Sequence, residues 1–427
     1  MKAIILAAGK GERLQPFTYT KPKPLIPIVE RPLLDYTLEA LSKAGVEEAI
    51  IVGSYMLDEL MKYLKSQRKV RWKIVVQKEP LGTGDALKYI EPYVNENFIL
   101  IYGDILASYG MLKDMMSKLL RKRCDGLMLG VEVENPWDYG VLKIVDNNVK
   151  FIVEKPKIGS EPSNIVNGGV YILPREILSY VDSLKPSPRG EIELTDAINL
   201  MIRDGFKIGV HKVNSDEWFE LSKPWDILLI TKRILSGLKG KILGDVERGA
   251  TVRGPVFIGK DARVLSGAYI EGPSYIGDNC TIGPNCYIRP YTVIGRDSRI
   301  GNAVEIKASV LMSNTHVGHL SYVGDSVLGE GVNFGAGTLT ANLRFDDKPV
   351  PVTIRGERLS SGLRKLGAFV GDYVKTGINV SIMPGVKIGP YSWIAPGTVV
   401  YDDIPPNSIV KPSSKGYVVV RRHEEDS

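Results

Sequence analysis

An aliphatic residue recurs at every sixth position through much of the second half of the chain. The series is Val252, Ile258, Val264, Ile270, Ile276, Ile282, Ile288, Ile294, Ile300 and Ile306, and glycine follows several of its members. A six-residue period fits neither an amphipathic helix nor a free strand. It is the period of a solenoid in which every face of each coil points one aliphatic side chain inward. The repeat therefore predicts a left-handed parallel β-helix, an all-β structure.

The repeat is interrupted before the end of the chain. Its phase slips between Met312 and Leu328, and an insertion from Ala341 to Leu366 follows. The aliphatic series then resumes at Val370, Ile382, Ile388, Ile394 and Val400. Because the same period returns, we expect the solenoid to extend over residues 245–410.

Up to about residue 230 the chain follows a different pattern, in which short apolar runs alternate with helical ones. The strand-like runs are "AIILAA", "EEAIIVG", "KIVVQ", "NFILIYGD" and "GLMLGVEV", and helices are expected at residues 33–44 and 57–65. This alternation predicts a Rossmann-like α/β domain with a mainly parallel sheet and helices on both faces. Ligands of such domains bind beyond the C-terminal ends of the strands.

A chain of 427 residues suits two or three domains. We expect the α/β domain over residues 1–230, a connecting helix and linker over 231–244, and a C-terminal tail over 411–427. The helix is expected because residues 225–242 have helical spacing that ends in glycine and lysine, immediately before the first coil.

Charge and composition limit the partners of this chain. A formal net charge of +6 is mild for this length and suits small anionic molecules better than nucleic acid. Three cysteines make no disulfide framework, and no apolar stretch is long enough to cross a bilayer. We expect a cytoplasmic protein that binds neither nucleic acid nor membranes.

The first strand runs into an unusual loop, "LAAGKGERLQPFTYTKPKPL", at residues 6–25. Glycines after a strand let backbone N–H groups approach a phosphate closely. The stretch is not a P-loop, because no Lys-Ser/Thr pair follows its last glycine, and Leu14 stands where a dinucleotide fingerprint has its third glycine. A different kind of phosphate site is indicated.

The pattern L-A-A-G-x-G-x-R-L, followed by P-K-P-L, Gly-Thr-Gly and Y-G-D, resembles the sugar-1-phosphate nucleotidyltransferase family over nearly all of residues 1–230. The resemblance implies that a sugar phosphate attacks the α-phosphorus of UTP or dTTP and that pyrophosphate leaves. Catalysis is then alignment and charge neutralisation. Gly9 and Gly11 would wrap the triphosphate, Arg13 would fork onto its oxygens, and Lys23 would neutralise the α-phosphate or the leaving group.

Other positions of that family carry over by local match. Gln77 and Gly82 match the positions that read the pyrimidine, with Gly82 expected to leave room for the ring. Asp104 matches the metal-binding aspartate, and Glu220 stands where the second metal carboxylate is usually aspartate; Mg²⁺ is the implied metal. The implied sugar-phosphate residues are Gly140, Glu154, Lys155 and Asn167.

The stretch "VGHLSYVGDSVLGEGVNFGAGTLTANL", residues 317–343, resembles the acetyltransferase half of a second family. This is the bifunctional N-acetylglucosamine-1-phosphate uridylyltransferase/glucosamine-1-phosphate N-acetyltransferase family, whose two halves occur here in the same order. Acetyl transfer needs a base to take a proton from the attacking amine, and histidine is suited to this near neutral pH. His319 falls on the base position, and His316 is expected to be a bystander.

The same resemblance implies the other residues of the acetyl-transfer site. The acetyl-acceptor positions are Arg289, Lys307, Tyr322, Asn333, Asn342 and Lys348. Ala336 and Ala395 match small positions along the arm of acetyl-CoA, the cosubstrate. Leu343 replaces an aromatic residue of the bacterial enzymes, and Gly377 stands where they tend to have serine. Neighbouring subunits complete these half-sites in the family, which implies a homotrimer.

The sequence therefore predicts a two-activity enzyme that makes a nucleotide sugar, with UDP-N-acetylglucosamine as the expected product. Two alternatives remain open at this point. One is a monofunctional glucose-1-phosphate thymidylyl- or uridylyltransferase with a structural β-helix. The other is a non-catalytic assembly protein that senses nucleotide sugars. The intact Arg13, Lys23 and Asp104 disfavour the sensor, and His319 disfavours the purely structural β-helix.

Overall fold

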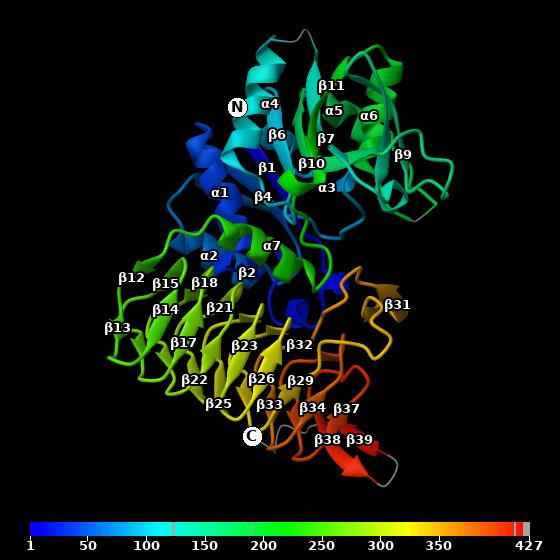
Figure 1. Cartoon of the computed structure of the whole chain (residues 1–427). Helices are drawn as coiled ribbons and strands as arrows, with labels where there is room; N and C mark the ends of the chain where they lie inside the picture. The colour runs from blue at the N-terminus through cyan, green and yellow to red at the C-terminus, as the bar shows by residue number, and fades with distance from the viewer. Residues whose placement is uncertain (122–123, 189, 414–415, 422–427) are drawn as a thin grey trace. The chain divides into compact units, whose positions relative to one another are not determined.

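The computed structural model describes residues 1–121, 124–188, 190–413 and 416–421 (Figure 1). The chain forms two compact units. The first comprises Met1–Lys10, Pro22–Leu25 and Pro32–Glu220, and the second comprises Gly11–Lys21, Ile26–Arg31 and Leu221–Ser427. Within the described ranges, no helix is long and apolar enough to cross a membrane. The expected tail lies partly outside the described residues, at 414–415 and 422–427.

The first unit is built on a sheet with the strand order β5-β4-β1-β6-β10-β7-β11-β9-β8. Its strands are β1 (Ala3–Ala7), β4 (Glu48–Gly53), β5 (Arg71–Val76), β6 (Phe98–Tyr102), β7 (Gly126–Glu132), β8 (Gly140–Val145), β9 (Asn148–Glu154), β10 (Ile165–Leu173) and β11 (Ile208–Asn214). Strands β5, β4, β1 and β6 run parallel, whereas β10 is antiparallel to β6 and β7. The five strand-like runs of the sequence are β1, β4, β5, β6 and β7, so the expected α/β fold is confirmed.

Helices cover both faces of this sheet (Figure 1). They are α1 (Leu33–Lys43), α2 (Leu57–Ser66), α3 (Asp85–Lys88), α4 (Tyr109–Arg121), α5 (Ile177–Val181) and α6 (Leu194–Arg203). Alternate residues of a strand face opposite sides, so Ile5 and Ile51 enter one core while Ile4 and Ile50 enter the other. Burial on both faces explains why β1 and β4 read as continuous apolar runs.

The second unit is a parallel β-helix, as the six-residue repeat predicts. It starts after α7 (Asp226–Ser236), and its coils contribute to three sheets in the part that the structure describes. The first sheet contains β12 (Lys241–Ile242), β15 (Val256–Ile258), β18 (Ser274–Ile276), β21 (Thr292–Ile294), β24 (Val310–Leu311), β27 (Val327–Leu328), β32 (Phe369–Val370) and β35 (Lys387–Ile388).

The other two sheets repeat the same stacking. The second contains β13 (Asp245–Val246), β16 (Arg263–Val264), β19 (Thr281–Ile282), β22 (Arg299–Asn302), β25 (His316–His319), β28 (Asn333–Phe334), β33 (Lys375–Thr376), β36 (Trp393–Ile394), β38 (Ser408–Ser413) and β39 (Gly416–Arg421). The third contains β14 (Thr251–Arg253), β17 (Tyr269–Glu271), β20 (Tyr287–Ile288), β23 (Glu305–Lys307), β26 (Tyr322–Gly324), β29 (Leu339–Thr340), β34 (Ser381–Ile382) and β37 (Val399–Val400).

The pairing of strands accounts for both the repeat and its slip. Ile258 pairs with Ile276, and Ile276 with Ile294, so each of these coils takes eighteen residues, six for each face. Ile294 then pairs with Leu311, and Leu311 with Leu328, so the next coils take only seventeen. The shortening falls at the corner between the third and first sheets.

That corner is irregular in three successive coils. Ala308 and Asp325 turn it with φ of 45° and 49°, in the left-handed region. In the following coil the insertion leaves from the same corner, after β29, and includes the hairpin of β30 (Pro351–Ile354) and β31 (Glu357–Ser360). The phase slip of the sequence therefore marks one particular edge of the solenoid.

An ion pair inside the second unit anchors the segment Gly11–Lys21. The Asp372 side chain is 2 % exposed and pairs with the Lys21 ammonium, while its Oδ2 accepts a hydrogen bond of 2.6 Å from Thr20. Glu330 lies 3.2 Å from the same ammonium. Burial lowers the pKa of Lys21, but the two carboxylates outweigh burial and the pKa lies above its ordinary value.

We expect Lys21→Met to lower the free energy of unfolding by about 3 kcal/mol, because it leaves the buried Asp372 carboxylate without its counter-charge. Since the pKa of Lys21 is raised on folding, this difference from wild type holds at neutral pH and falls as the pH rises beyond the ordinary lysine value of 10.5. Urea unfolding curves between pH 7 and about pH 11 measure both. The matched control is Lys43→Met, whose i,i+4 pair with Glu39 is exposed and worth about 0.5 kcal/mol.

Candidate active sites

The opening loop follows β1 and depends on one glycine conformation. Gly11 has φ of 66°, and its carbonyl accepts hydrogen bonds of 2.8 Å from the Leu14 amide and from the Thr18 hydroxyl. Leu14 is fully buried, whereas Arg13 beside it is exposed. The buried leucine therefore fixes a short turn from which the guanidinium reaches solvent.

Within the first unit, Lys23 contacts one of the two expected metal carboxylates, and the backbone of the other lies nearby. Lys23 Nζ lies 2.6 Å from Asp104 Oδ2. Ile105 forms an isolated β-bridge with Glu220, and the Leu106 amide donates to the Phe219 carbonyl at 3.0 Å, so the segments that carry Asp104 and Glu220 run side by side. A metal held by both carboxylates stays a prediction.

The surroundings of Asp104 fit a divalent cation. Its Oδ1 is buried and accepts no hydrogen bond from the described residues, and a buried unpaired oxygen is costly unless it has a ligand. Mg²⁺ is usually held by one or two protein carboxylates together with phosphate oxygens and water. Asp104 and Glu220 would supply the protein part of that set, and no group of three acidic, histidine or cysteine ligands occurs in the described ranges.

Gln77 follows β5 and is 2 % exposed. Its Nε2 donates to Asp85 Oδ2 at 2.8 Å, which fixes the orientation of the amide. Because a carboxylate only accepts, the amide oxygen of Gln77 is the end left to accept a hydrogen bond from the N3–H of uracil or thymine. Asp85 was not among the residues that the sequence analysis selected.

The structure gives a backbone reason for the glycine at position 82. Its φ is +127°, and a Cβ there would lie 2.7 Å from the Ile192 backbone nitrogen. The glycine is needed because two backbone segments approach each other closely. Room for the pyrimidine ring at this position stays a prediction.

The expected sugar-phosphate residues lie together where β8, β9 and β10 meet. Gly140 pairs with Glu154 in the sheet, and a Cβ on Gly140 would lie 2.7 Å from Glu154 Oε2 and 3.6 Å from the Asn167 Cβ. Lys155 follows with φ of 44°. Tyr102 adjoins this group, and burial raises its pKa to about 12, so its hydroxyl keeps its proton.

On the third sheet of the solenoid, Lys307, Tyr322 and Asn342 come together around Asp325. Lys307 Nζ lies 2.9 and 2.6 Å from the two oxygens of Asp325. Asn342 Nδ2 donates to Asp325 Oδ2 at 2.5 Å and to Tyr322 Oη at 3.1 Å. We call these four residues the acceptor cluster.

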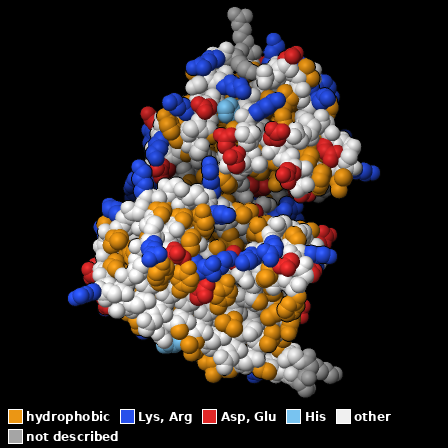
Figure 2. All heavy atoms as spheres, in the orientation of Figure 1, with side chains coloured by type: hydrophobic (Ala, Val, Ile, Leu, Met, Phe, Trp, Pro, Cys, Tyr) orange, Lys and Arg blue, Asp and Glu red, His pale blue; other side chains and the backbone are white. Residues whose placement is uncertain are grey.

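Arg289 follows β20, the strand that pairs with the Lys307 strand β23 on the same sheet. Its guanidinium donates to Glu305 Oε1 at 2.9 Å and lies 5.7 Å from the ring centre of Tyr287. Figure 2 shows lysine and arginine side chains gathered among apolar ones across the solenoid. The cations expected to bind a sugar phosphate are thus held by carboxylates before any ligand arrives.

The remaining expected residues of the solenoid lie elsewhere. Asn333 pairs with His316 on the second sheet, and His319 ends β25 at the corner between the second and third sheets. Lys348 is exposed in the insertion, where its amide donates to Asp346. In one chain, therefore, the structure does not bring Asn333 or Lys348 into contact with the acceptor cluster.

The small residues expected along acetyl-CoA follow the strands of the second sheet. The Ala336 carbonyl accepts from the Asn379 amide at 2.8 Å, and the Ala395 amide donates to Val410 at 2.8 Å. A Cβ on Gly377 would lie 2.6 Å from the Pro396 ring, so this glycine is required by packing. Leu343 is 41 % exposed and forms an isolated bridge with Lys365.

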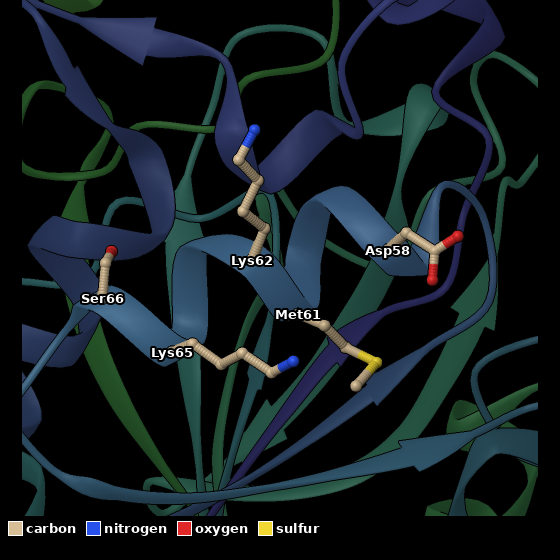
Figure 3. Close-up of a pocket in the computed structure, with 5 residues that line it drawn as sticks. All are labelled: Asp58, Met61, Lys62, Lys65 and Ser66. Atoms are coloured by element: carbon tan, nitrogen blue, oxygen red, sulfur yellow. The ribbon is translucent and has the colours of Figure 1, made fainter.

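A shallow depression lies over α2 and is lined by Asp58, Met61, Lys62, Lys65 and Ser66 (Figure 3). All five side chains come from one helix and point in different directions in the close-up. None of them belongs to either expected site, so this depression has no part in the chemistry described here.

Comparisons with known proteins identify the family of this chain. A family model described as "Nucleotidyl transferase" matches residues 2–236, and one described as "GMPPB C-terminal domain" matches residues 270–360. A bifunctional sugar-1-phosphate nucleotidylyltransferase/acetyltransferase of Sulfurisphaera tokodaii is 47% identical over 95% of this chain and 98% of its own. The bifunctional protein GlmU of Methanocaldococcus jannaschii is 41% identical over 96% and 97%.

The chain belongs to this bifunctional family. Among solved structures, a UDP-glucose pyrophosphorylase complexed with UDP-glucose is similar, with a TM-score of 0.50 and 28% identity over 54% of this chain and 96% of that one. The protein is therefore a sugar-1-phosphate nucleotidylyltransferase and acetyltransferase. Of the readings that the sequence left open, the monofunctional enzyme and the non-catalytic sensor are not favoured.

The side-chain contacts in both sites also involve acidic residues that the sequence analysis did not select. Asp85, Glu305 and Asp325 each hold one of the selected residues in place. Asp325 was hidden by repetition, because the dipeptide Gly-Asp recurs along the solenoid, as at Asp278 and Asp372. Only the side-chain contacts separate Asp325 from these others.

We expect Asp104→Asn to reduce nucleotidyl transfer by about a hundredfold and to raise the Mg²⁺ concentration needed for half-maximal rate, because a neutral amide holds the cation poorly. Pyrophosphate release titrated with Mg²⁺ measures both effects. The matched control is Asp114→Asn, a substitution on α4 outside the proposed site. A wild-type Mg²⁺ curve for Asp104→Asn would remove this residue from the metal site.

Proposed function

We propose that the chain makes UDP-N-acetylglucosamine in two steps at two separate sites. The solenoid transfers the acetyl group of acetyl-CoA to glucosamine 1-phosphate, and the α/β unit then transfers a uridylyl group from UTP to the product. The observation that carries the proposal is the convergence of Lys307, Tyr322 and Asn342, because the nucleotidyl half alone would also suit a monofunctional enzyme.

For acetyl transfer, the amine nitrogen attacks the thioester carbonyl, His319 takes the proton that the amine loses, and the thiol of coenzyme A leaves. Lys307 and Arg289 bind the 1-phosphate, since both are cations on one face of the third sheet. Tyr322 and Asn342 orient the sugar. Asn333, Lys348, Ala336 and Ala395 complete the subsites for the acceptor and coenzyme A.

For nucleotidyl transfer, a phosphate oxygen of the sugar attacks the α-phosphorus, and pyrophosphate leaves. Arg13 and Lys23 neutralise the phosphates, and the backbone at Gly9 and Gly11 donates to their oxygens. Mg²⁺ on Asp104 and Glu220 would neutralise charge on the triphosphate.

Recognition of the base uses a residue after β5, and recognition of the sugar uses residues of β8, β9 and β10 and the residue after β9. Gln77 accepts from the base, and Asp85 holds its amide in the orientation that this requires. Gly140, Glu154, Lys155 and Asn167 receive the sugar phosphate. The likeness to a UDP-glucose complex favours UTP over dTTP.

The organisation of the chain belongs to the same proposal. We infer a nucleotidyltransferase domain over 1–230, a connecting segment over 231–244, an acetyltransferase domain over 245–410 and a tail over 411–427. We also infer a homotrimer, because Asn333 faces outward from the second sheet and the acceptor cluster from the third. Side chains on different faces of a solenoid diverge, so they meet when a second copy brings its own face across.

The proposal predicts thiol release from acetyl-CoA with glucosamine 1-phosphate, measured for wild type and for His319→Ala. We expect the variant to lose about a hundredfold or more in this rate, because it lacks the base, while pyrophosphate release from UTP persists. His316→Ala is the matched control, since it lies on the same strand and is expected to be inert. No thiol release by wild type with glucosamine or galactosamine 1-phosphate would reduce the solenoid to a scaffold.

The shared site predicts complementation between two inactive variants. Asn333→Ala and Lys307→Met chains are unfolded and refolded together, so that mixed trimers form. About a quarter of the sites then combine an intact second-sheet half with an intact third-sheet half, and acetyl transfer returns to about that fraction of wild type. If the acetyl-transfer rate of the mixture is no greater than the summed rates of the separately refolded variants, both residues belong to a site within one chain.

A further inference from the structure

Asp325 is the residue about which the acceptor cluster is arranged. Its side chain is 14% exposed and that of Lys307 is 17% exposed, so the pair is largely removed from solvent. Both carboxylate oxygens contact Lys307, and Oδ2 also accepts from Asn342. The described contacts of this carboxylate are therefore with residues of the proposed acceptor site.

This use of an aspartate differs from that of similar residues along the solenoid. The Asp278 carboxylate accepts from the Lys260 backbone amide at 2.8 Å, and the Asp372 carboxylate accepts from the Glu330 amide at 2.8 Å. Those two satisfy backbone groups of the neighbouring coil. Among the described contacts of Asp325, the side-chain oxygens reach no backbone amide. A role in joining the coils does not account for it.

The hydrogen bonds of Asp325 determine what its neighbours offer to a ligand. A carboxylate only accepts, so Asn342 must turn its amide nitrogen toward Asp325. The same nitrogen also donates to Tyr322 Oη, so both N–H groups of the Asn342 amide are used. The amide oxygen of Asn342 is then left as an acceptor, and the O–H of Tyr322 is left as a donor.

The tyrosine keeps that proton. Burial raises the pKa of Tyr322, and the nearby carboxylates of Asp325 and Glu305 raise it further. Lys307 has three N–H donors, of which two are directed at Asp325, so one remains for a phosphate oxygen. The cluster thus presents a cation, a donor and an acceptor in fixed orientation.

Gly324, which pairs with Lys307 in the sheet, makes room for these side chains. A Cβ at Gly324 would lie 2.7 Å from Asn342 Nδ2 and closer still to the Tyr322 hydroxyl. The absence of a side chain at this position lets the two polar groups meet above the glycine. Gly324 and Asp325 therefore both help to place the side chains of the acceptor cluster.

We propose that Asp325 is a positioning residue of the acetyl-transfer site, which orients Lys307 and Asn342 for the amino-sugar 1-phosphate. The inference rests on the proposed function, since it assumes that this cluster binds the acetyl acceptor. Asp325 touches neither acetyl-CoA nor the reacting amine. Its loss acts on acceptor binding, through the two side chains that it holds.

Asp325→Asn tests the assignment, because an amide can donate as well as accept and no longer fixes the cluster. We expect the KM for glucosamine 1-phosphate to rise about tenfold or more, as for loss of one hydrogen bond to a charged group, with the KM for acetyl-CoA unchanged. Asp278→Asn is the matched control, and both KM values stay at wild type. Pyrophosphate release from UTP and the thermal midpoint monitor folding. Equal changes in both KM values, or none, would overturn the proposal.

A double-mutant cycle shows whether Asp325 acts through Lys307. In a Lys307→Met background, we expect Asp325→Asn to add less than about twofold to the KM for the acceptor. Full additivity would contradict the positioning role. If Lys307→Met and Asn342→Ala bind the acceptor as wild type does, the proposed site itself is misplaced. If Lys307→Met and Asn342→Ala raise the KM for the acceptor and Asp325→Asn leaves it unchanged, the proposed site stands and the positioning role of Asp325 is overturned.

Discussion

The solenoid depends on the pairing of each coil with the next one along the chain. Every coil contributes inward aliphatic side chains, such as Ile258, Ile276 and Ile294, that stack in a column and are fully buried. The backbone amides of one coil donate to the carbonyls of its neighbour, as from Gly259 to Ile276. Because register is fixed in this way, outward side chains also form columns, and a site can be assembled from residues seventeen positions apart such as Tyr322 and Leu339.

Both proposed sites hold their cations with acidic partners. Lys23 pairs with Asp104, Arg289 with Glu305, and Lys307 with Asp325. Long basic side chains carry large conformational entropy, and a carboxylate neighbour reduces the number of states that must be lost when a phosphate binds. The acidic residues therefore contribute to substrate binding by holding the cations in place. Of the three, the sequence analysis selected only Asp104, as a metal ligand.

The architecture could be predicted from the sequence because it rests on periodicity. The six-residue repeat identified the β-helix, and apolar runs identified β1, β4, β5, β6 and β7. The antiparallel insertion of β10 between β6 and β7 was not foreseen, since strand order is set by long-range packing that leaves no local signal. Likewise, the close approach of Gly82 to Ile192 was not foreseen, because it joins residues far apart in the chain.

The site residues came from matched motifs, and the structure adds which of them touch. Lys307 and Asn342 were selected from separate coils, and their common contact with Asp325 depends on side-chain directions that spacing does not give. The corner that carries Asp325 left a trace in the sequence as a phase slip, but a slip shows only that a residue is missing. It does not show which side chain fills the altered turn.

The acceptor cluster draws on three consecutive coils, from Lys307 through Asp325 to Asn342. Coils outside these three contribute stability and spacing but none of its polar contacts. A solenoid of this kind can therefore gain or lose whole turns nearer its first coil, in steps of eighteen residues, without disturbing the geometry of the cluster. The number of coils in the solenoid can thus change independently of the acceptor cluster.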